Sequence, residues 1–231
     1  MISHLDELSG NVEKQLLIGG MLGDSTVRKQ QNKYLIFRIK HTDKVADFVY
    51  WKKDNLPSFD VTVGREIREG REGGYQYSPN TKNQTYLHVC KQHPIFAKIR
   101  KLFYGLNENS VKKGIMVYHK CKLPYTFVDE LDLLGLLIWY LDDGNRSPNT
   151  RFYGTISVKT LPNHSLTRLI NRFNREYDLN MRLTNGGDTV SIPKKSMQKL
   201  LPIWNKMADD FGIPDSIRYK LRPDGRAKVA A

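Results

Sequence analysis

Two stretches of this sequence, far apart in the chain, read almost alike: residues 16–24 are LLIGGMLGD and residues 136–144 are LLIWYLDDG. Each is an apolar run that ends in aspartate, at Asp24 in the first and at Asp143 in the second. Neither run approaches the roughly 20 apolar residues that are needed to cross a bilayer. We therefore interpret both as buried helices that open two copies of one repeated unit.

The segments that follow these two helices repeat the same order of elements. We expect helix, strand, strand, helix, strand, strand, helix in each copy, which is an α+β fold of two pseudo-symmetric αββαββα repeats with antiparallel sheets. Residues 1–110 are predicted to form the first repeat, 111–123 a linker and 124–231 the second repeat. The expected helices are 12–24, 44–52, 94–104, 126–143, 165–177 and 196–211, and the expected strands are 34–40, 61–67, 85–89, 152–158, 181–183 and 189–192.

The first helix contains glycines that an ordinary core helix would avoid. Gly19, Gly20 and Gly23 each cost about 1 kcal/mol relative to alanine inside a helix. Gly19 and Gly23 are four residues apart and share one helix face, where the missing side chains let another backbone approach closely. The pattern predicts that the two opening helices pack side by side about a pseudo-twofold axis.

Both opening helices end in carboxylates, where the partial negative charge of the helix C-terminus disfavours them. A cation at that point would be stabilised by the carboxylates and by the nearby helix carbonyls. Since the packed helices would bring Asp24 and Asp143 close together, the sequence predicts paired metal sites between two scissile phosphates. The candidate metal-site residues are Asp24, Asp143, Gly23 and Asp142.

At these residues the sequence resembles the LAGLIDADG homing endonucleases, in the monomeric form with two motifs in one chain. The motif falls on residues 17–25 and 136–144, and its eighth position, the catalytic acid of the family, is Asp24 in the first copy and Asp143 in the second. This register favours Asp143 over Asp142 as the metal-binding acid, and Asp142 is expected to cap or orient neighbouring groups. The end of the second motif resembles that of free-standing, intron-encoded members.

The resemblance also implies a basic residue near the end of each half that orients water or stabilises developing charge. Lys220, within the segment IRYKL at residues 217–221, is similar to the second-half element. Lys113 is the first-half candidate, with Lys112 and Lys120 as alternatives. The candidate catalytic residues are therefore Asp24, Asp143, Lys220 and Lys113.

The charge of the chain indicates its partner. Among 231 residues there are 37 lysines and arginines against 24 acidic residues, a formal charge of +13 spread along the whole length. Such a surplus favours a polyanion, with nucleic acid the first candidate. The 39% hydrophobic content excludes general disorder. The N-terminus lacks the order of a secretory signal, and two cysteines favour free thiols, so we expect a reducing intracellular compartment: cytoplasm, nucleoid or organelle matrix.

The alternation of two strands predicts a surface for that partner. In residues 34–40 the apolar Leu35, Phe37 and Ile39 share one face, and Arg38 and Lys40 share the other. The strand near residue 152 repeats the pattern, so we expect the two polar faces to form a saddle that lies in the DNA major groove. The candidate DNA contacts are Arg28, Lys29, Arg38, Lys40, Arg65, Arg68, Gln84, Arg151, Tyr153 and Arg182.

These observations predict a site-specific, metal-dependent DNA endonuclease that hydrolyses phosphodiester bonds across the minor groove of a long asymmetric site, with Mg²⁺ or Mn²⁺ as cofactor. The resemblance implies short 3′ overhangs, a monomer, double-stranded DNA as the partner and no membrane. An RNA-binding maturase that acts on its own intron RNA is the alternative, although the presence of both acids favours the nuclease. A zinc site from Cys90, His93, His119 and Cys121 is less favoured, because the spacing of the second pair is short.

Overall fold

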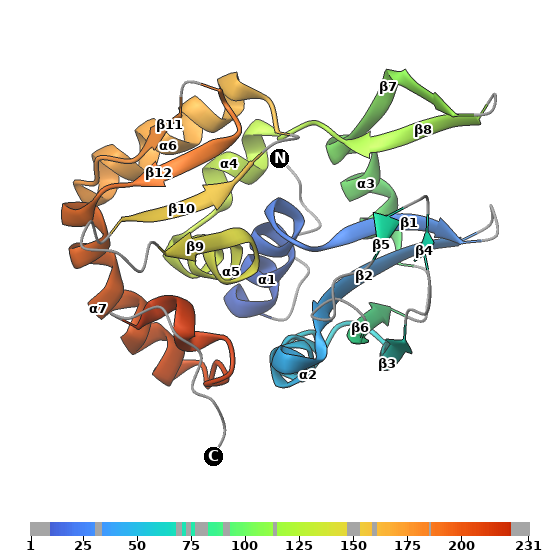
Figure 1. Ribbon diagram of the computed structural model, residues 1–231, viewed down its shortest axis with the longest axis horizontal. Coiled ribbons are helices and arrows are strands. Elements are labelled where there is room, and N and C mark those ends of the chain that lie inside the picture. The colour runs from blue at the N-terminus through green and yellow to red at the C-terminus, as the bar shows by residue number, and fades with distance from the viewer. Residues whose placement is uncertain are drawn as a thin grey trace.

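Two helices lie side by side at the centre of the molecule, with one sheet on either side of them (Figure 1). This computed structural model describes residues 10–30, 34–67, 71–72, 75–76, 83–89, 93–112, 115–146, 153–158, 161–184 and 186–222. The central helices are α1 (Asn11–Leu22) and α5 (Leu133–Asp143), so both sequence motifs occupy the middle of the fold.

The remaining elements form two repeats around this helix pair. In the first repeat they are β1 (Thr26–Gln30), β2 (Tyr34–Thr42), the 3-10 helix η1 (Asp43–Val45), α2 (Ala46–Asp54), β3 (Val61–Ile67), β4 (Arg71–Glu72), β5 (Tyr75–Gln76), β6 (Asn83–Val89) and α3 (Pro94–Phe103). In the second they are β9 (Gly144–Arg146), β10 (Gly154–Ser157), α6 (Asn163–Tyr177), β11 (Arg182–Leu183), β12 (Thr189–Ile192), α7 (Lys194–Asp210) and the 3-10 helix η3 (Arg218–Leu221). The expected αββαββα order is confirmed in both.

The two four-stranded sheets have equivalent topologies. Their strand orders are β1-β2-β6-β3 and β9-β10-β12-β11, and all pairings within them are antiparallel. In each repeat the first strand begins within two residues of the motif acid. Sequence patterning missed both of these strands, because β9 is only three residues long and β1 is rich in exposed polar side chains.

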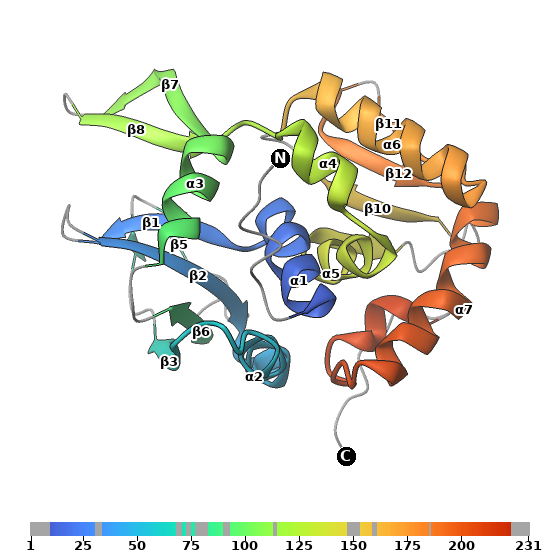
Figure 2. The same cartoon turned by 180° about the vertical axis from the view of Figure 1, so that it is seen from behind.

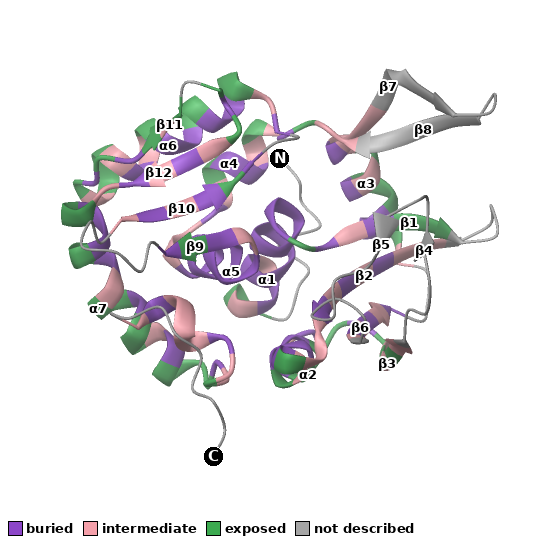
Figure 3. Ribbon diagram, viewed as in Figure 1, coloured by how far each residue is buried: buried purple, intermediate pink, exposed green. Residues whose placement is uncertain are grey.

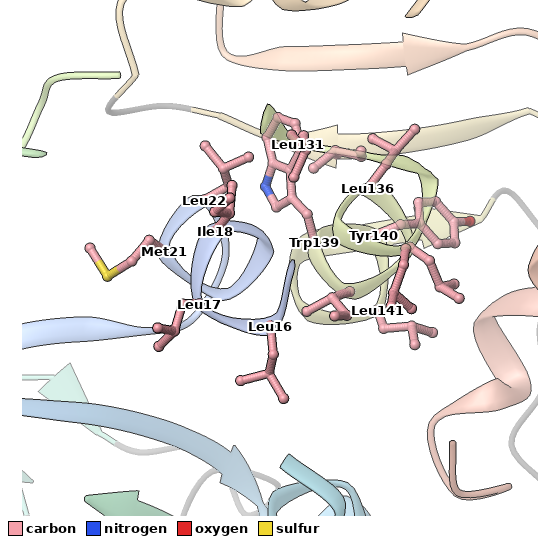
Figure 4. Close-up of a cluster of buried hydrophobic side chains, with 14 of the residues drawn as sticks. Leu16, Leu17, Ile18, Met21, Leu22, Leu131, Leu136, Trp139, Tyr140 and Leu141 are labelled. Carbon is pink, nitrogen blue, oxygen red and sulfur yellow. The ribbon is translucent and has the colours of Figure 1, made fainter. Parts of the chain in front are cut away.

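The buried surface runs through the helix pair and under both sheets (Figure 3). Phe37 and Ile39 of β2 are fully buried and Arg38 is partly exposed, which confirms the predicted alternation. Trp139 and Trp204 are also buried, and Trp51 donates from its Nε1 to the Phe211 carbonyl at 2.7 Å. Figure 4 shows the apolar side chains that α1 and α5 contribute to the centre of this core.

The close approach of α1 and α5 explains the glycine pattern. A Cβ at Gly19 would lie closer than 3.0 Å to the backbone oxygen of Gly135 in the facing helix. A Cβ at Gly23 would lie 2.6 Å from the Cβ of Asp142. Only glycine fits at these points, so the helix propensity lost at Gly19 and Gly23 is exchanged for close packing against α5.

Replacing Gly19 by alanine is therefore expected to destabilise the protein. The added methyl group meets backbone, which cannot move aside as a flexible side chain would, and such overpacking costs about 1–3 kcal/mol beyond the helix propensity gained. Chemical unfolding measures the loss. Gly186→Ala is the control, because nothing lies within 4 Å of a Cβ at that position. Equal stability of the two variants would contradict the proposed contact.

Residues 126–143 were expected as one helix and instead form two, α4 (Tyr125–Glu130) and α5. Asp132 begins α5 by accepting hydrogen bonds from the backbone of Leu134 and Gly135. The buried Gln15 of α1 fills the break, because its amide donates to the Glu130 carbonyl and accepts from the Asp132 backbone. Capping by Asp132 and the side chain of Gln15 together satisfy the polar groups that a break exposes.

Part of the predicted linker is also regular structure. The strands β7 (Tyr104–Lys112) and β8 (Ile115–Lys120) pair as a hairpin that projects beside α3, and residues 121–124 then lead into α4 (Figure 2). Residues 111–112 and 115–120 of this linker are therefore strands, which the sequence did not indicate because they show no period-two alternation of apolar and polar residues. Among the described residues, no helix combines the length and the apolar character that crossing a membrane requires.

Candidate active site

The C-terminal ends of α1 and α5 come together on one side of the helix pair. The two helices run parallel, since Asn11 at the start of α1 donates to Asp132 at the start of α5 and the Asp24 backbone at the other end contacts Asp142. Asp24 follows α1 after Gly23, and Asp143 is the last residue of α5. The structure thus brings the two predicted acids to the same end of the interface.

Each helix end also receives a lysine from its own repeat. Lys120, at the end of β8, donates from Nζ to the Gly23 carbonyl at 2.6 Å and to the Ser25 carbonyl at 3.4 Å. Lys220 of η3 donates to the Leu141 carbonyl at 2.6 Å and to the Asp142 carbonyl at 2.9 Å. Each ammonium therefore contacts the carbonyl that directly precedes the motif acid, where helix carbonyls lack intrahelical partners.

This symmetry distinguishes the first-half lysine candidates. Lys120, which the sequence left as an alternative, occupies the position equivalent to that of Lys220. Lys113 lies outside the described residues, and the side chain of Lys112 is likewise not described. A local sequence signal could not single out Lys120, because its partner carbonyls are about a hundred residues away in the chain.

The environment of Asp24 and Asp143 disfavours their ionised forms, despite the nearby lysines. Burial raises the pKa of Asp143 to about 7, repulsion from Asp24 and Asp142 adds to this, and Lys120 and Lys220 act against it. Burial and repulsion from Asp142 also raise the pKa of Asp24 above its usual range. Burial lowers the pKa of Lys120 and Lys220. Perturbed groups of this kind gather where a protein carries out chemistry.

Replacing Asp143 by asparagine is expected to stabilise the metal-free protein at alkaline pH. The folded pKa of about 7 lies above the ordinary aspartate value of 3.8, so between these values the folded state holds a proton that the unfolded state releases. The free-energy cost of ionising Asp143 in the folded protein is absent below about pH 4, grows as the pH rises and is complete above about pH 7. Because solvent screens the charge of this partly exposed carboxylate, we expect Asp143→Asn to raise the unfolding free energy by about 1–2 kcal/mol at about pH 8.

Urea unfolding in the presence of a chelator, at about pH 8 and at about pH 4, measures this difference between Asp143→Asn and the wild type. The two proteins should differ at the higher pH and nearly coincide at the lower. A variant that is less stable at both pH values would show that the carboxylate stabilises the fold instead of straining it.

Asp142 belongs to a separate, buried cluster. Its side chain is fully buried, and its Oδ1 accepts a hydrogen bond from Lys52 Nζ at 2.5 Å and lies 3.4 Å from His41 Nε2. The Lys52 side chain is also fully buried, and its Nζ lies 3.1 Å from His41 Nε2. Although burial raises the pKa of Asp142, Lys52 and His41 outweigh it, so the pKa lies well below its usual range. The carboxylate is ionised and paired.

Asp24, His41 and Asp142 offer ligand atoms that all lie within 4.8 Å of one another. However, Lys52 already neutralises the Asp142 carboxylate, and a second cation beside its ammonium would be repelled. The Asp24 side chain is 38% exposed and faces a groove of about 1000 Å³ that Lys40, His41 and Lys220 also line. The geometry therefore leaves the Asp24 carboxylate available to a metal ion. The Asp142 carboxylate instead pairs with the neighbouring Lys52 ammonium.

A model of the LAGLIDADG DNA endonuclease family matches residues 14–200, which include most of α1, all of α5 and both four-stranded sheets. The chain belongs to that family. Among solved structures, the homing endonuclease I-WcaI bound to its DNA recognition sequence is similar to this LAGLIDADG chain, with a TM-score of 0.65 and 15% identity over 96% of this chain and 92% of that one. The meganuclease I-SmaMI bound to uncleaveable DNA has a TM-score of 0.50 and 10% identity, over 94% and 95%. Comparison with curated proteins gave no match.

The first sheet of this LAGLIDADG chain presents a polar face on the side away from its helices. Strand register places Arg28, Arg38, Lys40 and Gln84 together on that face. Arg38 lies over the Tyr86 ring at 4.4 Å, and both Arg38 and Lys40 pair with Glu66, at 2.9 Å and 2.5 Å. The sequence missed Glu66, which neutralises part of the positive charge of this face.

The other predicted DNA contacts are distributed differently. Lys29 and Arg65 lie on the opposite face of the first sheet, and Arg65 contacts Asp43. In the second sheet the exposed Arg182 shares a face with Thr155, and Tyr153, two residues before Thr155, is partly exposed. Arg68 and Arg151 lie outside the described residues. For the zinc alternative, His93 accepts from the Ile95 backbone at the start of α3, and Cys90 is not described.

Proposed function

We propose that this protein is a site-specific double-strand DNA endonuclease that cuts one phosphodiester bond in each strand. The observation that carries the proposal is the duplicated arrangement at the ends of α1 and α5. There, an acid, a helix terminus and a lysine recur in each pseudo-symmetric repeat: Asp24 with Lys120, and Asp143 with Lys220. Two pseudo-symmetric centres at one interface suit two antiparallel strands, because a twofold axis relates the strands as a pseudo-twofold axis relates the repeats.

The residues of the site fit a divalent cation. Asp24 and Asp143 offer carboxylate oxygens at two helix C-termini, and burial together with repulsion between the acids raises the pKa of Asp143, which a bound cation would offset. We infer that the carboxylates of Asp24 and Asp143 hold Mg²⁺ or Mn²⁺, while the carbonyls of Gly23 and Asp142 hold the ammonium groups of Lys120 and Lys220. A bound cation of this kind polarises a phosphate and stabilises the leaving oxygen.

The chain itself supplies charge and orientation around those ligands. Lys120 and Lys220 are held by helix carbonyls, so their ammonium groups are already in place when DNA binds. From there they stabilise the negative charge that develops on each phosphate as water attacks. Because burial lowers the pKa of both lysines, either could also pass a proton to or from that water at its Nζ.

The two polar sheet faces are proposed to lie in the DNA major groove on either side of the cut. The first face carries Arg38, Lys40 and Gln84, whereas the second carries Thr155, Ser157 and Arg182. These side chains read different base edges, so the preferred site should be long and asymmetric. Cutting across the minor groove with short 3′ overhangs, and an intron as the genetic setting, are part of the same proposal.

The direct test is cleavage of a plasmid library that carries randomised inserts. The protein is incubated with the library and Mg²⁺ or Mn²⁺, and the new ends are sequenced. We expect one long motif with staggered ends that carry 3′ extensions. Absence of any cut motif, together with specific binding of intron RNA, would contradict the endonuclease and support a maturase.

DNA binding is expected to weaken steeply as salt rises. If 6–10 phosphates are contacted, affinity falls by about 10³–10⁵-fold between about 50 and about 200 mM salt. Fluorescence anisotropy with a random-sequence duplex, in Ca²⁺ or a chelator, measures the slope. Arg38→Gln should reduce the slope, while Lys53→Gln on the exposed surface of α2 serves as the control. A salt-independent affinity would exclude the basic face as a phosphate contact.

A further inference from the structure

The two pseudo-symmetric centres are not chemically equivalent. Strand register makes this comparison possible: Thr26, two residues after Asp24, pairs with Arg38, and Asn145, two residues after Asp143, pairs with Thr155. Arg38 is therefore equivalent to Thr155. Three residues further along, His41 in the first repeat is equivalent to the buried Val158 in the second.

The same comparison extends to the neighbouring helices. Counting on from His41 and Val158 makes Lys52 of α2 equivalent to Leu169 of α6, and both side chains are buried. Between the motifs, Asp142 is equivalent to Gly23. A charged cluster of Asp142, Lys52 and His41 therefore lies beside Asp24. By the same counting, the residues equivalent to these three around the other centre are Gly23, Leu169 and Val158, none of which is charged.

The polar contacts of this cluster form a chain that ends at Asp24. The Lys52 ammonium, which can only donate, lies 3.1 Å from His41 Nε2 and 2.5 Å from Asp142 Oδ1. The tautomer in which Nε2 accepts from Lys52 carries its ring N–H on Nδ1. His41 Nδ1 lies 3.4 Å from Asp24 Oδ2, so this ring nitrogen faces one oxygen of that carboxylate.

The His41 ring has little freedom to turn away. Its side chain is only 7% exposed, and it packs against Phe48 with ring centroids 5.3 Å apart. Asp142 reaches the cluster through the space left by the missing side chain of Gly23. An N–H held in this way fixes the carboxylate it faces, as the outer partners of metal ligands do. Val158 has no polar atom, so the equivalent position offers Asp143 no such donor.

We propose that His41 is a positioning residue that holds the Asp24 carboxylate ready for the cation, so that the strand served by Asp24 is cut before the strand served by Asp143. This inference rests on the proposed function, since it concerns the order of two cuts. It predicts that a duplex nicked in one defined strand accumulates during the reaction. The strand in question is identified by Asp24→Asn, which should remove its cut.

The experiment follows both strands of a duplex recovered from the plasmid library, with a different fluorophore on each strand, under single-turnover conditions in Mg²⁺. We expect His41→Leu to slow the Asp24-dependent cut by about 10–100-fold and the other cut by less than about 2-fold. His41→Asn should recover much of the rate, because the asparagine amide places an N–H near the position of Nδ1. Val158→Leu, the matched change in the other repeat, should leave the order of the cuts unchanged.

Several results would overturn this inference. Equal slowing of both cuts by His41→Leu would assign His41 a general structural role, as would failure of His41→Asn to restore the order. Circular dichroism and thermal unfolding show whether each variant is folded, and His41→Asn, which keeps a polar group in the cluster, provides the second variant if His41→Leu is not. If the wild type cut neither strand of any duplex, the endonuclease proposal would fail and this inference with it. Normal cutting of both strands without a preferred first nick would overturn this inference alone.

Discussion

Asp24→Asn and Asp143→Asn are each expected to reduce double-strand cleavage by about 10³-fold or more. A metal-bound carboxylate contributes several kcal/mol of transition-state stabilisation, and each 1.36 kcal/mol corresponds to a tenfold change in rate. Asparagine keeps the shape but loses the charge that retains the cation. Plasmid linearisation under single-turnover conditions measures the loss, with each variant assayed beside the wild type in both Mg²⁺ and Mn²⁺.

The stability of these variants separates chemistry from folding. Asp143→Asn should be more stable than the wild type near pH 8, so its loss of cleavage cannot be attributed to unfolding. Asp54→Asn, at the exposed end of α2, is the matched control and should cut at the wild-type rate. Undiminished linearisation by both active-site variants would refute the assignment of Asp24 and Asp143 as the metal ligands.

The architecture could be predicted because its strongest constraints are local. An apolar run that ends in an acid, with glycines four residues apart, indicates a helix that packs closely against another backbone. The structure shows this contact between Gly19 of α1 and the Gly135 backbone of α5. Period-two alternation in β2 similarly separated Phe37 and Ile39 from Arg38. In each case the deciding residues lie within one turn of helix or one strand.

The parts that sequence reasoning missed depend on contacts between distant residues. The break before α5 is favourable because Gln15, more than a hundred residues earlier, hydrogen-bonds the backbone that the break exposes. Lys120 and Lys113 look alike in sequence, and only the fold shows that Lys120 reaches the Gly23 carbonyl. His41 and Lys52 likewise gave no local signal, because their partner, Asp142, comes from the other repeat.

Charge counting was informative about the partner and less so about individual contacts. The excess of +13 indicated a polyanion, but it did not show that Glu66 lies between Arg38 and Lys40 on the polar face. Such a carboxylate orients both cations and competes with phosphate for them. The contribution of each arginine to DNA affinity therefore depends on its neighbours and cannot be read from the net charge.

Asp142→Ala is expected to lower the unfolding free energy by about 3–5 kcal/mol, the second large effect that the structure predicts. Lys52 and the Asp142 carboxylate are both fully buried, so removing Asp142 leaves the Lys52 ammonium without its charged partner. Lys52→Leu should cost a similar amount, because it leaves the buried Asp142 carboxylate uncompensated. Urea unfolding near pH 7 measures both losses, and Lys53→Leu, on the exposed side of α2, controls for the change of residue type.

The double variant Lys52→Leu with Asp142→Ala gives the sharper test. The equivalent positions around the other centre are already occupied by Leu169 of α6 and Gly23 after α1, which shows that this fold accepts uncharged residues there. Removing both charges together should therefore restore much of the stability that either single change removes, whereas independent contributions would add. A double variant as unstable as the sum of the singles would show that the pair is a net source of stability. Recovery would instead show that the fold tolerates the loss of both charges, so that orienting His41 toward Asp24 becomes the reason to retain the pair.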